Sequence, residues 1–433
     1  MIDQNLAGAI MVGLLPVLLI FGMPIGLALA GSGIVGLVLT RGWAPMDFML
    51  GTFSYAYTAN LAFIVLPLFL FMGHMTFVTG VSDRAFSAAQ RLIGNVSGGL
   101  AMATVAASAG FAMVCGSSVA AASTIGKIAI PEMLKRGYAP QLAAGVVAAG
   151  GTLGVLIPPS GILVVYSIAT QTSLVDLFLA ALVPGIITAI AYAVLVFGMV
   201  ALKPSLGGER PRLQGGDRLK ALVSSWEIAI LFAIVMGGIY LGIATPTEAA
   251  AVGALVAALL VFRQKGSKYR MIRNGLLETG SATSSIFLLI IGAGLFSTGL
   301  ATTQIPVHLA NWAVEFSSNR YLVLLLVLMP FFILGMFVDG ISMLLLTMPI
   351  VFPVIKQLGF DPIWFGIVVT KTVEIGLLTP PVGLNAFVVR SVAPEIPLPA
   401  IFRGCVPFIV VEFLLVGALV AWPGMTQVLI AGR

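Results

Sequence analysis

Apolar stretches of helix length recur along nearly the whole chain, and they constrain its fold more than any other feature. These stretches are 7–30, 61–79, 98–113, 140–157, 178–200, 228–243, 247–262, 284–302, 322–336 and 404–422. Most of them approach the ~17–25 residues with which a helix spans a bilayer, and they do not alternate as barrel strands do. Only 9% of the residues are charged, whereas a soluble domain has about 25%. The sequence therefore predicts an all-α polytopic protein embedded in a lipid bilayer.

The remaining composition argues against several other classes of protein. The net charge of +6 comes from basic residues scattered between apolar stretches. This distribution indicates an excess of basic residues in the loops of a membrane protein and does not indicate binding of nucleic acid. Cys115 and Cys405 are isolated, so we interpret both as small apolar residues. Asp3 stands where a secretory signal carries a basic residue, and no cleavage site is evident, so the first stretch predicts a retained span.

Two short motifs indicate an internal duplication. Residues 154–161 read GVLIPPSG and residues 376–383 read GLLTPPVG, 222 positions later. Further Gly and Pro pairs share this offset: Pro131 with Pro353, Gly137 with Gly359, and Pro140 with Pro362. We therefore expect segment 61–172 to be repeated as 283–394. Pro184 and Pro407 extend the match with one inserted residue.

The distribution of basic residues predicts that the second repeat is inverted, as in many secondary transporters. A basic loop at 263–273 contains Arg263, Lys265, Lys268, Arg270 and Arg273. Its counterpart at 41–51, found by the same offset, has a single basic residue. The loop 203–220 is also basic, and two short apolar stretches separate it from 263–273. We expect both basic loops on the cytoplasmic side.

Each repeat contains two kinds of interruption. A helix ends before a proline and can restart with fresh N–H groups beyond it. The Pro-Pro motifs therefore predict discontinuous helices over 140–172 and 362–394. Segments 115–133 and 337–355 are too short and too interrupted for one span plus a turn, so each predicts a re-entrant hairpin of two half-helices.

The two broken helices offer a chemistry that an intact span lacks. Carbonyl oxygens freed at the end of the first half-helix are ligands for a cation, and the N–H groups at the start of the second half-helix favour an anion. Such backbone is tolerated at membrane depth only where protein or a cavity covers it. The alternative is a proline kink that merely shapes the bundle, which two matched copies make less attractive.

Four motifs carry a resemblance to a known family. LGVLIPPSGILVVYSIAT, GLLTPPVGLNAFV, CGSSVAAASTIGKIAIPEM and GIATPTEAAAVGAL together resemble the large membrane subunit of tripartite ATP-independent periplasmic (TRAP) transporters. The likeness extends over essentially the whole chain. It implies sodium-coupled uptake of a carboxylate solute (a C4-dicarboxylate, sialic acid or another organic acid) across the bacterial cytoplasmic (inner) membrane.

The resemblance also implies partners and a mechanism. The partners are a small four-helix membrane subunit and a soluble periplasmic substrate-binding protein, with Na⁺ as coupling ion and no organic cofactor. The mechanism is that of an elevator of the ion-transporter-superfamily type, in which a transport domain slides against a scaffold. The expected division is scaffold 1–60, transport repeat 61–172, scaffold 173–282, transport repeat 283–394 and a C-terminal span 395–433.

The same resemblance points to candidate site residues. A first sodium site is expected from Ser117, Ser118, Gly154, Ile157 and Pro159, and a second from Gly335, Asp339, Gly376, Thr379 and Val382. Candidate substrate residues beside the breaks are Thr152, Ser160, Asn385 and Arg390. Asp339 is a functional candidate because it is an intramembrane acid, but it can equally cap a half-helix. Lys371 and Glu374, three residues apart, are expected to pair with each other.

Three other functions are alternatives to a tripartite transporter. A stand-alone carrier of another inverted-repeat family would work without a binding protein. An intramembrane enzyme is disfavoured because the sequence has no HExxH, GxSxG or Walker A motif. A channel is disfavoured because two broken helices suit binding and occlusion better than a continuous pore. We therefore expect a transporter and not an enzyme.

Overall fold

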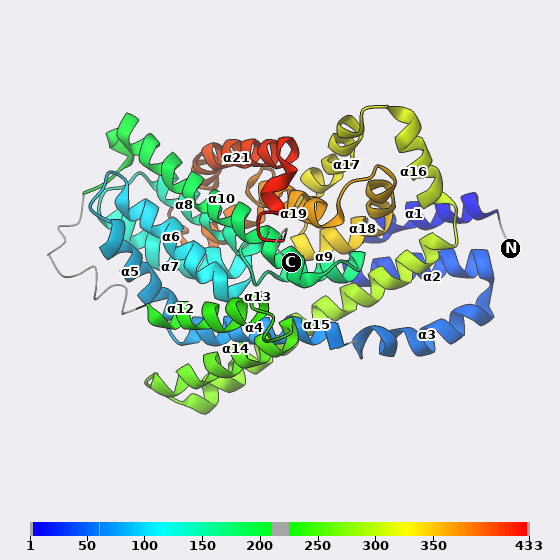
Figure 1. Cartoon of the computed structure of the whole chain (residues 1–433), viewed down its shortest axis with the longest axis horizontal. Helices are drawn as coiled ribbons and strands as arrows, with labels where there is room; N and C mark the ends of the chain where they lie inside the picture. The colour runs from blue at the N-terminus through cyan, green and yellow to red at the C-terminus, as the bar shows by residue number, and fades with distance from the viewer. Residues whose placement is uncertain (1–2, 60, 210–224, 431–433) are drawn as a thin grey trace.

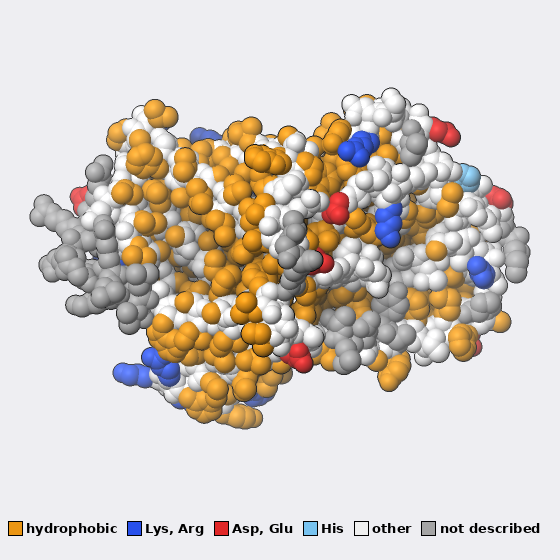
Figure 2. All heavy atoms as spheres, viewed as in Figure 1, with side chains coloured by type: hydrophobic (Ala, Val, Ile, Leu, Met, Phe, Trp, Pro, Cys, Tyr) orange, Lys and Arg blue, Asp and Glu red, His pale blue; other side chains and the backbone are white. Residues whose placement is uncertain are grey.

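The computed structural model describes residues 3–59, 61–209 and 225–430, and every regular element in these ranges is a helix (Figure 1). Six helices are long and apolar enough to cross a membrane, or up to seven if the bent pair α4 and α5 forms one span. Hydrophobic side chains cover much of the face in Figure 2, with few charged ones among them. The predicted all-α, multi-span class is confirmed. Most of the expected basic loop 203–220 lies outside the described residues.

The N-terminal region forms short helices because glycine and proline interrupt its apolar stretches. The elements are α1 Gln4–Ile20, α2 Ile25–Arg41, α3 Trp43–Thr58, η1 Leu61–Ile64, α4 Val65–Val78 and α5 Val81–Ile93. Pro24 is the N-cap of α2 and divides the stretch 7–30 into two helices. The chain bends by 67° between α4 and α5.

The first repeat continues with two paired helices and one broken helix. These elements are α6 Gly99–Cys115, α7 Ser118–Lys135, α8 Pro140–Leu156 and α9 Gly161–Thr170. α8 starts with a proline at its first position, where no N–H is needed. It ends where Pro158 and Pro159 cannot donate the next helical hydrogen bonds.

The second repeat reproduces these elements with the predicted offset. Its helices are α17 Arg320–Gly335, α18 Gly340–Gln357, α19 Pro362–Leu378 and α20 Leu384–Val392. Both ends of α18 lie 222 positions after those of α7, and the same holds for α19 and α8. The duplication inferred from the sequence is confirmed. The orientation of the two repeats relative to the membrane stays a prediction.

The remaining elements connect or follow the repeats. They are α10 Leu174–Leu202, η2 Pro204–Leu206, α12 Trp226–Phe232, η3 Ala233–Gly237, α13 Gly238–Tyr240, α14 Pro246–Leu260, η4 Val261–Arg263, α15 Lys268–Ala301, α16 Ile305–Phe316, α21 Leu398–Ala421 and η5 Pro423–Thr426. α15 is a continuous helix of 34 residues. It therefore runs through the expected boundary between 282 and 283, and it begins inside the expected loop 263–273.

The expected bounds of the two hairpins were wrong. Segment 115–133 is not a hairpin by itself, because α7 runs unbroken past Pro131, and α18 likewise contains Pro349 and Pro353. Each hairpin instead pairs this helix with the one before it, α6 with α7 and α17 with α18. The first helix of the first hairpin, α6, was not recognised because its sequence looks like that of an ordinary apolar span.

The packing divides some elements differently from the expected domains. α4, which belongs to the first repeat by sequence, packs most extensively against α14 and α15. α10 and α21, expected outside the repeats, pack against α8. A Cβ atom on Gly145 of α8 would lie 2.2 Å from the carbonyl oxygen of Gly404 in α21, so the backbones of these two helices are in contact. The division into scaffold and transport domain stays a prediction.

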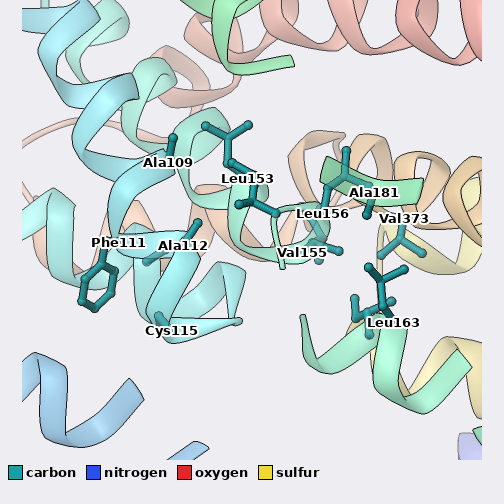
Figure 3. Packing of buried hydrophobic residues seen from close by; sticks show 14 of the residues in the cluster. Ala109, Phe111, Ala112, Cys115, Leu153, Val155, Leu156, Leu163, Ala181 and Val373 are labelled. Carbon is teal, nitrogen blue, oxygen red and sulfur yellow. The ribbon is translucent and has the colours of Figure 1, made fainter. Parts of the chain in front are cut away.

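The main apolar cluster extends over most of the described helices and includes the region where the two broken helices meet. In Figure 3, Leu153 and Leu156 from the end of α8 lie near Leu163 of α9 and Val373 of α19. All four side chains are buried in one continuous apolar cluster. This packing fixes the positions of both breaks relative to each other.

Candidate functional site

The tip of the first hairpin is pressed against the first break. Gly116 ends α6 with a φ of +63° and accepts a hydrogen bond from the backbone N–H of Gly161, N···O 3.3 Å. A Cβ atom on Gly116 would lie 2.6 Å from the carbonyl oxygen of Pro159. On the other side of the break, a Cβ atom on Gly154 would lie 3.0 Å from the carbonyl oxygen of Ser117. Only glycine allows these backbones to approach so closely.

The second hairpin and the second break meet in the same way. The backbone N–H of Gly383 donates to the carbonyl of Met336 over 3.1 Å. A Cβ atom on Gly376 would lie 2.6 Å from the Cα of Gly335. Asp339 caps α18 by accepting hydrogen bonds from the N–H groups of Ile341 and Ser342, both at 3.1 Å.

Both tips and both breaks border one central cavity of about 230 Å³. Its lining residues are Leu66, Phe69, Leu70, Cys115, Gly116, Ser117, Ser118, Val119, Val155, Pro159, Gly161, Ile162, Ile286, Asp339, Gly340, Ile341, Leu377 and Leu384. α4 and α15 also contribute residues to this lining. The side chain of Asp339 is the only charged one in this lining.

Four of the described helices begin at this cavity. Their first residues are Ser118 of α7, Gly161 of α9, Gly340 of α18 and Leu384 of α20, and all four residues line it. A helix N-terminus carries a partial positive charge and unpaired N–H groups, which favour an anion. α20 starts at Leu384, and its N-cap Gly383 supplies no side-chain cap, whereas Ser117, Ser160 and Asp339 cap the other three helices. The cavity therefore offers positive backbone potential without a basic side chain.

The first break also leaves a backbone oxygen without a donor. Pro158 and Pro159 have no N–H, so the carbonyls of Gly154 and Val155 lose their usual helical partners. Ser160 Oγ donates to the Val155 carbonyl instead. Among the residues that the structure describes, no donor outside α8 hydrogen-bonds to the Gly154 carbonyl. At the second break Thr379 Oγ1 donates to Ile375 over 2.6 Å, so its hydroxyl hydrogen is already used.

The structure brings part of the predicted sodium-site residues to the cavity. Ser117, Ser118, Pro159 and Asp339 line it. The others, Gly154, Ile157, Gly335, Gly376, Thr379 and Val382, lie at the breaks or the second tip but do not line it. Ser117 Oγ accepts from the N–H of Ala120 as the N-cap of α7. The predicted sodium sites themselves stay predictions.

None of the four predicted substrate residues lines the cavity. Ser160 is the N-cap of α9, and Thr152 donates to the Ala149 carbonyl over 2.7 Å. Asn385 donates to the Ala148 carbonyl over 3.1 Å, and Arg390 to the Ile396 carbonyl over 2.7 Å. Their role in substrate binding therefore stays a prediction. The hydrogen bonds described above join them to other parts of the protein.

A second cavity of about 420 Å³ adjoins the central one. The two share Leu70, Cys115, Ser117 and Val119. The second cavity is bordered by the exposed Lys127 of α7 and by His74 of α4, which pairs with Glu278 of α15 at 3.0 Å. The central cavity thus continues toward the end of α15 that follows the basic loop.

Sequence reasoning also missed part of a buried charged cluster. The expected pair of Lys371 and Glu374 exists, with Nζ and Oε2 2.6 Å apart and both side chains fully buried. Lys371 also contacts Glu412 of α21, which was not singled out. An acid within the apolar stretch 404–422 was the available signal. Among the residues that the structure describes, no group of three His, Cys, Asp or Glu side chains suits a metal ion.

The broken helices, the paired hairpins and the cavity between them are the features of a multi-pass membrane transporter. The chain belongs to the family described as the tripartite ATP-independent periplasmic transporter, DctM component, which it matches over residues 12–425. The family consists of transporter permeases, so the chain is a transporter and not an enzyme.

Named relatives support this family, and one solved structure shares the fold. The chain is 38% identical over 80% of its length to the C4-dicarboxylate TRAP transporter large permease protein DctM of Pseudomonas aeruginosa, of which it covers 81%. It is 32% identical over 95% of its length to the sialic acid TRAP transporter large permease protein SiaM of Vibrio cholerae, of which it covers 96%. The Alcanivorax borkumensis YdaH transporter shares the fold, with a TM-score of 0.62, 14% identity and coverage of 89% of this chain and 90% of that one.

Proposed function

We propose that this chain carries a carboxylate solute into the cell, driven by sodium ions, through an elevator movement of the hairpins and broken helices. The observation that carries the proposal is the convergence of four helix N-termini on one cavity beside two helix breaks. N-termini favour the negative charge of a carboxylate, and carbonyl oxygens at the breaks favour a cation. The cavity can favour a carboxylate and a cation in this way although no basic side chain lines it.

The two relatives support a carboxylate as the solute. One is named for C4-dicarboxylates and the other for sialic acid. Both solutes carry at least one carboxylate, and this is the group that the helix N-termini of the cavity suit. The cavity of about 230 Å³ fits a small organic acid better than a large one.

The coupling ion is proposed to bind where each tip meets its break. Na⁺ is a hard cation that prefers oxygen ligands, like other ions of its kind. The Gly154 carbonyl and the carbonyl of Ser117 lie on the two sides of the first contact. Asp339 at the second tip adds the negative charge that the first tip lacks. We therefore propose two sodium sites of unequal chemistry.

The elevator proposal rests on the composition of the cavity wall. Hairpin tips and broken helices form one side, whereas Leu66, Phe69 and Leu70 of α4 and Ile286 of α15 form the other. These four side chains are apolar and offer no polar bond that would have to break during sliding. A movement of the first side past the second would carry the bound solute with it.

Family membership supports two further partners. We propose a separate small membrane subunit with four helices and a soluble periplasmic substrate-binding protein, because the family is tripartite and both relatives are named large permeases. The location follows as the bacterial cytoplasmic (inner) membrane. The stand-alone carrier remains the alternative that the transport assay must exclude.

The test is uptake of labelled succinate and sialic acid into proteoliposomes that contain this chain with the small subunit. We expect uptake of one of them only with an inward sodium gradient and only when its binding protein is added outside. Sodium-independent uptake would overturn the coupling, and uptake without the binding protein would favour the stand-alone carrier.

The elevator is tested by crosslinking in a background without Cys115 and Cys405. Cysteines at Leu70 on α4 and Val119 on α7, both at the cavity, should arrest uptake when crosslinked. A control pair at Gly126 and Val392 joins α7 to α20, where a Cβ on Gly126 would lie 3.0 Å from Val392 Cγ2, and should leave uptake intact. Undiminished uptake after complete crosslinking of the first pair would contradict the elevator.

A further inference from the structure

The second cavity, of about 420 Å³, holds a lysine that the proposed solute and sodium sites do not use. Four residues of α7 line this cavity at the spacing of one helix face: they are Ala120, Ser123, Thr124 and Lys127. Ala122 on the opposite face is fully buried, and a Cβ atom on Gly151 of α8 would lie 2.7 Å from its Cβ. α7 therefore turns a polar face to the second cavity and an apolar face to the protein.

The polar groups on this face of α7 are available for a ligand. Among the residues that the structure describes, Lys127 Nζ has no ion-pair partner, and the hydroxyls of Ser123 and Thr124 have no hydrogen-bond partner. The other two ionisable residues of the lining, His74 and Glu278, are paired with each other, with Nδ1 and Oε2 3.0 Å apart. Lys127 is therefore the charge of this lining that a ligand can neutralise.

Lys127 lies at a depth where a charge needs water or an anion. It is midway along α7, and the helical rise places it about 13 Å from the hairpin tip at Ser118. A charged side chain within a membrane-spanning bundle faces a partner or a water-filled cavity, because contact with lipid tails is costly. A lysine can also extend its ammonium to the lipid headgroups. Here the lysine lines the cavity, and the Cα–Cβ bonds of α7 tilt toward the tip.

Basic residues continue from Lys127 toward the surface on two of the helices that line the second cavity. α7 ends at Lys135. α15, which contributes Glu278 to the lining, carries Lys268, Arg270 and Arg273 in the turns before it. A carboxylate that leaves the central cavity by this route would meet Lys127 first and the basic ends of α7 and α15 next. The sequence predicts that this side of the protein is cytoplasmic.

We propose that Lys127, with the hydroxyls of Ser123 and Thr124, forms a second binding site that receives the carboxylate of the solute between the central cavity and the cytoplasm. This inference rests on the proposed transport of a carboxylate and names the residues that bind it on release. An ammonium and two hydroxyls supply several hydrogen-bond donors to carboxylate oxygens. The two cavities share Ser117 and Val119, so the second site adjoins the first.

The charge of the site can be measured by alkylation of a thiol, independently of transport. We introduce Ser123→Cys into the full-length chain without Cys115 and Cys405, purify it in neutral detergent, and compare anionic and cationic methanethiosulfonate reagents. Residues at i and i+4 lie about 6 Å apart, where a unit charge changes each rate by about threefold even in water. Lys127→Met should therefore lower the ratio of anionic to cationic rate by about tenfold. Lys127→Arg should keep the ratio, as should Lys135→Met, a control on the same helix outside the cavity lining. An unchanged ratio in Lys127→Met would overturn the proposal.

Succinate serves as the probe of carboxylate binding in the same proteins. We expect succinate to slow alkylation at position 123 several-fold, compared with potassium chloride of equal ionic strength, when residue 127 is Lys or Arg. The protection should be lost in Lys127→Met and kept in Lys135→Met. If succinate gave no protection with Lys127 present, or equal protection in Lys127→Met, the second site would be refuted.

Uptake gives a readout that a structural role of Lys127 would not produce. In proteoliposomes, Lys127→Met should weaken the inhibition of uptake by succinate inside the vesicles by about tenfold, the usual loss for a hydrogen bond to a charged group. The external concentration for half-maximal uptake should stay that of wild type. Equal inhibition in both proteins would count against the site. A failure of sodium-driven uptake would leave the alkylation measurements unaffected, so the two proposals fail separately.

Discussion

The contact between Gly376 and Gly335 offers a sharp test of the second proposed sodium site. In Gly376→Ala the new Cβ would lie 2.6 Å from the Cα and carbonyl carbon of Gly335. Carbon atoms pack best at about 3.5–4.0 Å. The second hairpin tip must therefore move away from α19 by about 1 Å. Backbone atoms form both sides of this contact, so no side chain can yield instead.

The size of the effect follows from the cost of overpacking. Extra methyl groups in a well-packed core cost about 1–3 kcal/mol. If the displaced tip holds the ion, that energy is lost from sodium binding, and each 1.4 kcal/mol is about a tenfold change in affinity. We expect the sodium concentration for half-maximal uptake to rise about tenfold. Alanine also favours the helix by about 1 kcal/mol, so α19 itself should remain folded.

The assay is sodium-dependent uptake in proteoliposomes, with the thermal unfolding midpoint of the purified chain measured in parallel. The matched control is Gly417→Ala in α21, where a Cβ meets nothing within 4 Å. This control should bind sodium as wild type does. If Gly376→Ala folded normally and required no more sodium than wild type, the placement of an ion at this contact would be refuted.

The remaining predictions concern the first tip and two helix caps. Gly116→Ala should impair sodium-driven uptake far more than Gly137→Ala, because both glycines have positive φ but only the first has a backbone atom in the way; equal loss in uptake assays would contradict this. Asp339→Ala should lower stability by about 1 kcal/mol as a lost cap, and Asp339→Asn should restore the unfolding midpoint while sodium dependence stays weakened. Full recovery of both in Asp339→Asn would show that Asp339 is only a cap. Thr245→Ala removes the capping box of α14 and should cost about 1 kcal/mol in chemical unfolding, with uptake unchanged; an unchanged unfolding curve would argue against the cap.

The broken helices were predictable because proline acts locally. Pro158 and Pro159 lack an N–H wherever the chain places them, so the end of α8 and the start of α9 could be found from the sequence. The offset of 222 between the repeats could be read in the same way, and it reproduces the bounds of α7 and α18. The hairpins were placed too late because segments 115–133 and 337–355 were taken as too interrupted for one helix, whereas α7 and α18 run through their prolines.

The site beyond these breaks depended on contacts between distant segments. Thr152, Ser160, Asn385 and Arg390 were chosen because they flank the breaks, but short-range position does not determine which side of a helix meets a cavity. Glu412 lies 38 positions after Glu374 in the sequence, and no spacing rule relates the two. Their juxtaposition follows from the packing of α21 against α8 and α19.

The sequence by itself determined the membrane class, the duplication, the helix breaks and the family. Each of these depends on local chemistry, namely apolar length, missing N–H groups and repeated motifs. Only the tertiary structure decided that four helix N-termini share one cavity, that α4 and α15 also line it, and that two acids meet one lysine in the core. These arrangements arise because close glycine contacts between helices, which no single segment encodes, bring distant backbones together.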